Sequence, residues 1–127
     1  MSGASAVVYV VDLDRMRAFY EGGLGLSVAE EGEGYCTLTG AGWTLSLVVV
    51  PTDLAASIQL GSPPARRTQS PIKLGFAVAS VDALVRPLAE LGGSVDPPST
   101  AWAHAGVVHR DAVDPEGNVV DLLQPAG

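Results

Sequence analysis

The sequence predicts an α+β fold built from two similar units, each with one strand, one helix and three further strands. The hydrophobic pattern passes twice through this order of elements, and each helical stripe ends at glycines. The composition, 47% hydrophobic and 17% charged, is sufficient for a buried core. The length of 127 residues fits a single domain, 1–127, with units at 5–50 and 72–125 joined by a connector at 51–71.

The first unit opens with an apolar, β-branched strand at 6–11, and Asp12 then offers a side-chain oxygen as the N-cap of a helix. Apolar residues at helical spacing predict that helix: Leu13, Met16, Phe19, Tyr20 and Leu24. Glycines from position 22 to position 25 end it. Three strands should follow, separated by glycine-rich turns, at 26–30, 34–38 and 43–50.

The connector, 51–71, differs from both units. It contains four prolines, an Arg66-Arg67 pair and little periodicity. A connection this long inside a compact domain is expected to be either a linker or a flap over a site.

The second unit repeats the first. After a strand at 72–78, Ser80 is the expected N-cap of a helix whose apolar stripe runs from Val81 to Leu91. Pro87 lies inside this stripe and predicts a kink or an early break of the helix. An irregular segment is expected at 97–106, and strands are expected at 94–96, 107–113 and 118–123.

The turn between the last two strands is strongly determined. Asp114 can cap it, Pro115 presets φ and Gly117 accepts a positive φ, so residues 114–118 predict a hairpin turn. Taken alone, this motif is structural.

The two units correspond to one another at a shift of 68 residues. Four apolar residues of the first unit match four of the second: Val10, Leu13, Met16 and Tyr20 match Val78, Val81, Leu84 and Leu88. This internal repeat indicates a duplication. Two such units side by side are expected to form one larger, curved, mixed sheet whose outer face the helices cover.

Charge and composition exclude several classes of protein. A net charge of −7 disfavours nucleic acid as a partner, because phosphate backbones are repelled. No apolar run approaches the ~18 residues of a membrane span, and the N-terminus lacks the features of a signal peptide, so no membrane contact and a cytoplasmic location are expected. The single cysteine, Cys36, is expected to be a small buried hydrophobe.

The order of elements resembles that of the vicinal oxygen chelate superfamily: glyoxalase I, extradiol dioxygenases, fosfomycin-resistance transferases and bleomycin-binding proteins. The similar segments span nearly the whole chain: 10–13, Phe19-Tyr20, 24–26, 74–78, 91–93 and 114–118. The resemblance implies the glyoxalase/bleomycin resistance fold, in which the two modules curve around a small-molecule cavity. It does not specify an activity.

Metal-using members of that superfamily place four ligands on the cavity face, two from each module. The corresponding positions here are Ser5, Ser46 or Leu47, Lys73 and Asp121. Only the carboxylate of Asp121 is a good ligand, and the ammonium of Lys73 repels a cation. The resemblance therefore implies a site with no metal and no other cofactor.

Lys73 and Asp121 should share the cavity if the fold is right. One hypothesis is that they form an ion pair, with the ammonium taking the place of a cation. The alternative is that Lys73 points out past the end of its strand and that Asp121 is solvated.

Four aromatic side chains are candidates for lining a flat, partly polar ligand site, and the alternative for each is a place in the core or at its rim: Tyr9, Tyr35, Trp43 and Trp102. A second cluster, His104, His109 and Arg110, precedes the terminal hairpin. His109 and Asp111 should share one face of their strand, where a histidine near a carboxylate can act as a general base or as a pH-sensitive contact. The alternative for both histidines is a surface position on a loop or at a strand edge. Arg110 faces the other way and suits either an anionic ligand group or a surface carboxylate.

The leading hypothesis is a metal-independent small-molecule binding protein, by analogy with bleomycin-binding members, that sequesters an aromatic or antibiotic-like compound. It assigns no catalytic residue and places ligand contacts at Tyr9, Tyr35, Trp43, Lys73, Trp102, His109, Arg110 and Asp121. The alternatives are an enzyme of lyase, isomerase or dioxygenase type that uses His109 or the Lys73–Asp121 pair, and a dimerisation or regulatory module without a ligand. A homodimer is expected, because related chains commonly complete their cavities by pairing.

Overall fold

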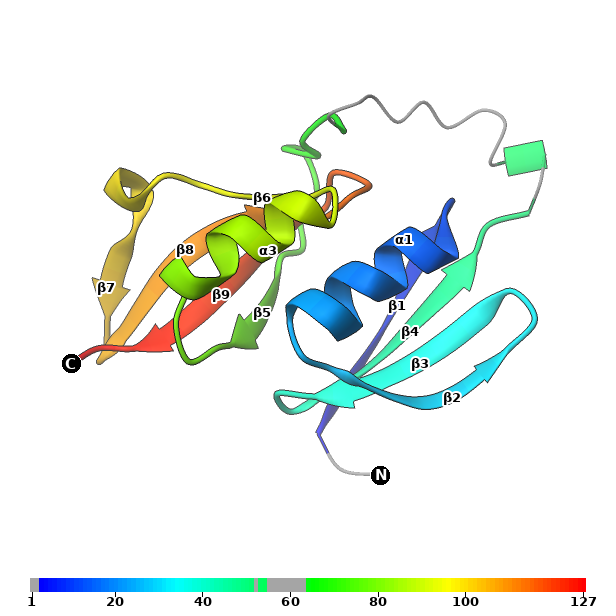
Figure 1. The fold of residues 1–127 in the computed structure, drawn as a ribbon, viewed down its shortest axis with the longest axis horizontal. Coiled ribbons are helices and arrows are strands. Elements are labelled where there is room, and N and C mark those ends of the chain that lie inside the picture. The colour runs from blue at the N-terminus through cyan, green and yellow to red at the C-terminus, as the bar shows by residue number, and fades with distance from the viewer. Residues whose placement is uncertain (1–2, 52, 55–63) are drawn as a thin grey trace.

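A computed structural model of the chain describes residues 3–51, 53–54 and 64–127. Its strands form two sheets that lie beside one another, each with a helical segment on the same side (Figure 1). The α+β class and the twofold repeat of the unit are therefore confirmed. Parts of the predicted connector, residues 52 and 55–63, lie outside the described residues.

The first sheet has four strands in the order β1-β4-β3-β2. Their bounds are β1 Ala4–Val10, β2 Ser27–Gly32, β3 Tyr35–Gly40 and β4 Trp43–Val49. The parallel pairing of β1 with β4 requires a crossover, which the helical segment after β1 begins. That segment is α1, Leu13–Arg17, followed by a π-helical turn, η1, Ala18–Gly23. Asp12 caps it as predicted, since its Oδ1 accepts from the backbone N–H of Arg15 at 3.1 Å.

The second sheet has five strands, with β5-β9-β8-β6 in order and β7 paired with β8. Their bounds are β5 Leu74–Ala77, β6 Ser94–Val95, β7 Trp102–His104, β8 Val107–Val113 and β9 Val119–Pro125. The prediction of an irregular segment at 97–106 missed β7 and a 3-10 turn, η3, Pro98–Thr100. Three residues are too few to show a strand period, so only pairing with β8 defines β7.

The helix of the second unit is interrupted as Pro87 predicted. A 3-10 turn, η2, Asp82–Leu84, precedes α3, Val85–Glu90, which places Pro87 in the first turn of α3. A backbone N–H in the first turn has no acceptor within the helix, so proline is tolerated there. Ser80 supplies the predicted cap, because its Oγ accepts from the N–H of Ala83 at 3.2 Å.

The core lies between the two helical segments and the sheets. Its members recur at matching places of the two units, as the shift of 68 predicted. Tyr20 and Leu88 are both buried, and in each of the other three pairs one residue is buried and its counterpart packs partly buried against the core. The predicted single curved sheet is divided, because the pairings of the described strands join no strand of one sheet to the other. Side chains join the halves instead. The indole Nε1 of Trp43 donates to the carbonyl of Gly75 at 2.7 Å, and its ring lies 6.1 Å from that of Phe76.

The turn at 114–118 holds the two halves together as well as closing its own hairpin. The fully buried carboxylate of Asp114 accepts from the hydroxyl of Tyr20 at 2.7 Å. The carboxylate of Glu116 accepts from the backbone N–H groups of Val11 and Asp12 at 2.8–2.9 Å. The hairpin turn is confirmed, but these bonds between residues about a hundred positions apart give it a second role that its local pattern does not reveal.

Cys36 is buried in the core, as expected, and burial raises the pKa of its thiol. Both features fit a structural role, since a reactive cysteine needs a lowered pKa and exposure. None of the helices in the described part of the chain has the length and apolar character needed to cross a membrane.

Candidate functional site

The second sheet has one face in the core and one face open. In the register of its strands, Gly75 lies beside Asp121, Asp111 lies opposite Asp121, and His109 lies opposite Leu123, so these residues share a face. The alternate residues of the same strands, Phe76 and Leu122 among them, are buried in the core. We call the side with His109, Asp111 and Asp121 the open face.

A histidine, an aspartate and a tryptophan meet on the open face. Nδ1 of His109 lies 2.8 Å from Oδ2 of Asp121, and both side chains are largely buried. The ring of Trp102, from β7, stacks on the imidazole with centroids 3.9 Å apart and an interplanar angle of 5°. Because a carboxylate only accepts, Nδ1 is the donor, and Nε2 has no hydrogen-bond partner among the described residues. Oδ1 of Asp121 is buried and also without a partner in that part of the chain.

Lys73 does not pair with Asp121, which corrects the predicted ion pair. Its ammonium lies 3.0 and 3.2 Å from the two carboxylate oxygens of Asp111. The two residues were correctly predicted to lie on the same side of the sheet, but that side has two carboxylates, Asp111 and Asp121, opposite one another. His109 takes one and Lys73 takes the other, and nothing in the sequence distinguishes them.

The other predicted site residues are spread over the molecule. Arg110 is buried on the core side, where it donates to the carboxylate of Asp82 at 2.7 Å and to the carbonyl of Asp96. Of the two predicted partners, a ligand anion and a surface carboxylate, the structure shows the carboxylate. Trp43 lies in the contact between the halves. The hydroxyl of Tyr35 donates to Glu30 at 2.9 Å on the first sheet. His104 is exposed, with its ring 6.5 Å from that of Trp102.

The residues that the resemblance places at the superfamily's metal positions are a poor set of ligands for a divalent cation. Ser46 shares a face with Ser5, and its Oγ lies 3.1 Å from Oγ1 of Thr37, whereas Leu47 is buried in the core. The other two positions, Lys73 and Asp121, are engaged with Asp111 and His109. Within the described ranges, no three His, Cys, Asp or Glu side chains are grouped to hold an ion. A hydroxyl pair, an ammonium and one carboxylate are a poor ligand set.

A cavity of about 510 Å³, which we call the junction cavity, lies where the two halves meet. It is lined by residues 6–9 of β1, Tyr20, Leu74 of β5, Asn118 and the first two residues of β9, and by Arg67, Ser70 and Ile72 from the segment before β5. More of these residues are apolar than polar, and Tyr9, which is one of them, is 66% exposed. The volume and lining are typical of small-molecule sites.

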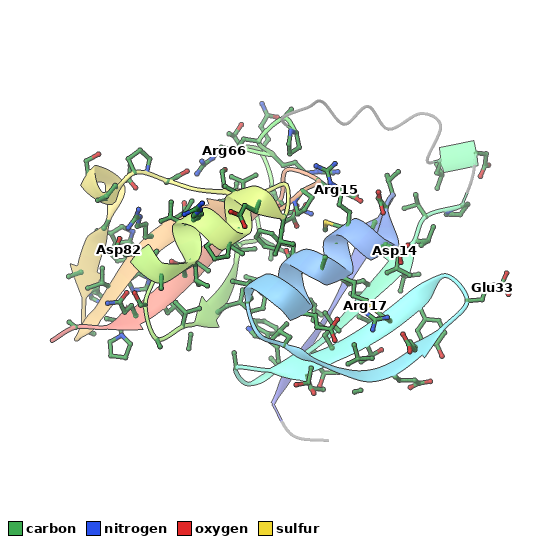
Figure 2. All side chains as sticks on the ribbon, in the orientation of Figure 1. Asp14, Arg15, Arg17, Glu33, Arg66 and Asp82 are labelled. Carbon is green, nitrogen blue, oxygen red and sulfur yellow. The ribbon has the colours of Figure 1, made fainter. Side chains whose placement is uncertain are left out.

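A second cavity of about 450 Å³, the cationic cavity, adjoins the first. Arg66, Arg67, Lys73 and Asp111 are its charged residues, so cations outnumber carboxylates in its lining. Arg66 lies on the segment that leads into β5 (Figure 2). The two cavities share four lining residues: Arg67, Ser70, Ile72 and Val119. Because Val119 lies on the same face of β9 as Asp121, the two cavities and the His109 group belong to one continuous side of the molecule.

The fold and this site can be compared with known proteins. The family model of the Glyoxalase/Bleomycin resistance protein/Dioxygenase superfamily matches residues 4–122. The chain belongs to this superfamily. None of the curated proteins compared with the chain matches it. The predicted family is thus confirmed, and the superfamily's paired modules account for the repeat.

Two solved structures of the superfamily show how far the likeness extends. A glyoxalase/bleomycin resistance protein/dioxygenase family enzyme from Burkholderia phytofirmans PsJN is 18% identical, with a TM-score of 0.68 over 95% of this chain and 96% of that one. A glyoxalase-related enzyme from Fulvimarina pelagi is 20% identical, with a TM-score of 0.67 over 95% of this chain and 86% of that one. At such identities the superfamily members share a fold, and the site must be argued from its own residues.

Sequence reasoning missed the part of the site that the connector supplies. Arg67 and Ser70 of the connector, with Ile72 directly after it, line both cavities. Asp111 is the partner of Lys73. The Arg66-Arg67 pair was a signal, since two cations in a proline-rich connector are unusual in so acidic a chain. Sequence alone could not show on which face the connector returns.

Proposed function

We propose that this chain is a metal-independent protein that binds a small molecule with an apolar, aromatic body. The observation that carries the proposal is the junction cavity, about 510 Å³ in volume, between edge strands of the two halves. The exposed ring of Tyr9 beside apolar walls is suited to packing against a flat ligand. The ligand set at the superfamily's metal positions supports a mechanism of binding without an ion.

Thermal unfolding against a panel of aromatic metabolites and antibiotics tests this proposal. A ligand at a hundred times its Kd should raise the free energy of unfolding by about 2.7 kcal/mol, because it binds only the native state. Tyr9→Ala should weaken that stabilisation. Tyr35→Ala is the matched control, because Tyr35 is a partly exposed tyrosine of the first sheet that does not line the cavity.

Added nickel, manganese or ferrous ions should change neither the ligand affinity nor the stability. A stoichiometric, tightly held ion on which ligand binding depends would contradict metal independence. A panel in which no compound stabilises the protein, or in which both tyrosine variants behave alike, would contradict the junction cavity as the binding site.

A second candidate function is an enzyme that uses His109 as a general base. The bond between Nδ1 of His109 and Asp121 favours it, since that carboxylate orients the ring and leaves Nε2 as the basic nitrogen. The stack with Trp102 fixes the ring plane. The carboxylate on which the ring depends is Asp121, not the Asp111 that shares its strand.

Proton exchange in deuterium oxide tests the enzyme. Compounds that stabilise the protein should exchange a carbon-bound proton for deuterium, as followed by NMR, and His109→Gln should slow the exchange by about a hundredfold or more. His104→Gln is the control, because His104 is an exposed neighbour that does not contact Asp121. Exchange that persists in His109→Gln, or that never occurs with the wild type, would exclude this candidate.

The homodimer expected from the family stays a prediction.

A further inference from the structure

The connector places one arginine on the boundary between the two cavities. Arg67 lines both the junction cavity and the cationic cavity. Its backbone N–H donates to the carbonyl of Gly117 at 2.9 Å, and its Nε donates to the carbonyl of Glu116 at 3.0 Å. Arg67 is therefore hydrogen-bonded to the 114–118 turn. That turn is itself ordered by Asp114, whose Oδ1 accepts from the backbone N–H groups of Glu116 and Asn118.

Gly117 allows this close approach. A Cβ at position 117 would lie 2.0 Å from the carbonyl oxygen of Ala65, and the φ of Gly117 is +88°. Only glycine lets the segment before Arg67 lie directly on the turn. Arg67 is exposed, but its guanidinium is held at Nε by the carbonyl of Glu116.

Arg67 also differs from the other cations of the cationic cavity in its charge pairing. Arg66 is bonded by both its terminal nitrogens to the carboxylate of Asp96, at 2.7 and 2.9 Å. Lys73 is paired with Asp111. In the described part of the chain, Arg67 has no carboxylate partner, and its two terminal nitrogens have no bond. One positive charge in the cationic cavity is therefore not neutralised within the described residues.

We propose that the ligand is an amphipathic anion whose apolar body fills the junction cavity and whose anionic group binds the terminal nitrogens of Arg67. The inference rests on the proposed function and names the ligand's chemical class. Two N–H groups of one guanidinium suit a carboxylate or a phosphate monoester. The chain's net charge of −7 repels anions in general, so an anion is held only where such a local cation is positioned.

Two probes with the same apolar body isolate the anionic group: naphthoate and its neutral amide, naphthamide. At an ionic strength of about 0.15 M, calorimetry should show naphthoate binding about tenfold tighter than naphthamide, which corresponds to about 1.4 kcal/mol. Arg67→Gln should abolish this preference and leave the naphthamide Kd unchanged. Arg67→Lys should retain part of it, because the charge remains while the fork of donors is lost.

Arg86→Gln is the matched control. Arg86 is an exposed arginine of α3 that pairs with Glu90 and lines neither cavity, so its loss should leave the preference intact. Naphthyl phosphate distinguishes the two anionic groups. If the wild type binds naphthyl phosphate more tightly than naphthoate, and Arg67→Gln removes that difference, the natural group is a phosphate. If the wild type binds naphthoate more tightly, the natural group is a carboxylate.

Equal wild-type affinity for naphthoate and naphthamide would overturn the anionic ligand while leaving the proposed binding function standing. A preference that survives in Arg67→Gln would overturn the role of Arg67. Binding of neither probe at about 1 mM would overturn the inference and would also count against the junction cavity as an aromatic site.

Discussion

Replacing Asp114 by alanine should lower the free energy of unfolding by about 3–5 kcal/mol, since four donors lose their acceptor at roughly 1 kcal/mol each. Those donors are the Tyr20 hydroxyl, the Asn118 amide and the backbone N–H groups of Glu116 and Asn118. All four surround a carboxylate that is fully buried. Urea unfolding measures the change, and a loss below about 1 kcal/mol would show that water satisfies these donors.

Asp114→Asn isolates the titration of this carboxylate, because an amide does not ionise. Its NH2 group replaces one accepting oxygen, so the hydrogen bonds that are lost add a cost that does not depend on pH. Burial is the main cause that raises the pKa of Asp114, and it outweighs the bonds from Tyr20 and Asn118 that lower it. A raised pKa means that the native state takes up a proton at a pH where the unfolded state does not. The resulting stabilisation is fully present below the unfolded carboxyl's pKa and is lost as the pH rises through the folded one.

The stability of the wild type relative to Asp114→Asn should therefore increase as the pH falls from neutral through the folded pKa of Asp114. It should level off below the ordinary pKa of an aspartate, about 3.9. Other titrating groups cancel in this difference, because both proteins contain them. A difference that stays constant, or that shrinks on acidification, would contradict the raised pKa.

Replacing Phe76 by alanine should cost about 3–5 kcal/mol of unfolding free energy, because it empties a filled position in the core. The ring of Phe76 is buried, with centroids 5.7 Å from the ring of Tyr20 and 6.1 Å from that of Trp43. It thus packs against aromatic rings of the other half. Since the two sheets share no backbone ladder among the described strands, this packing is a main part of what joins them.

Phe76→Leu is the matched control, since leucine refills most of the space and should cost clearly less. Both variants are compared by urea unfolding and by heteronuclear NMR of residues in the first sheet. For Phe76→Ala we expect changes in the NMR chemical shifts of Tyr20 and Trp43. A loss below about 1 kcal/mol, or spectra that change only within the second sheet, would contradict a role in joining the halves.

Much of the fold could be predicted because its signals are local. The helix caps at Asp12 and Ser80, the interruption just before Pro87 and the turn at 114–118 each depend on residues within about one turn of one another. The strand β7 could not be predicted, because its three residues become a strand only through pairing with β8. The divided sheet was equally invisible, since strand periodicity does not report whether two edges are bonded.

The candidate site was predictable as a face but not as a set of contacts. Alternation along β8 correctly placed His109 and Asp111 on one side and Arg110 on the other. Which carboxylate meets Lys73 and which meets His109 depends on how β5, β8 and β9 align, and on the reach of a long side chain. The alternation of side chains along one strand contains no information on how that strand aligns with its neighbours.

The sequence by itself determined the duplicated unit and its order of elements, because these follow from residue type and spacing along the chain. Only the tertiary structure decided that Asp114 and Glu116 bind the first unit, that His109 pairs with Asp121, and that Arg67 lies between two cavities. The physical reason is range. Propensity and periodicity act over a few residues, whereas these contacts join residues brought together by the packing of two halves and the return of the connector.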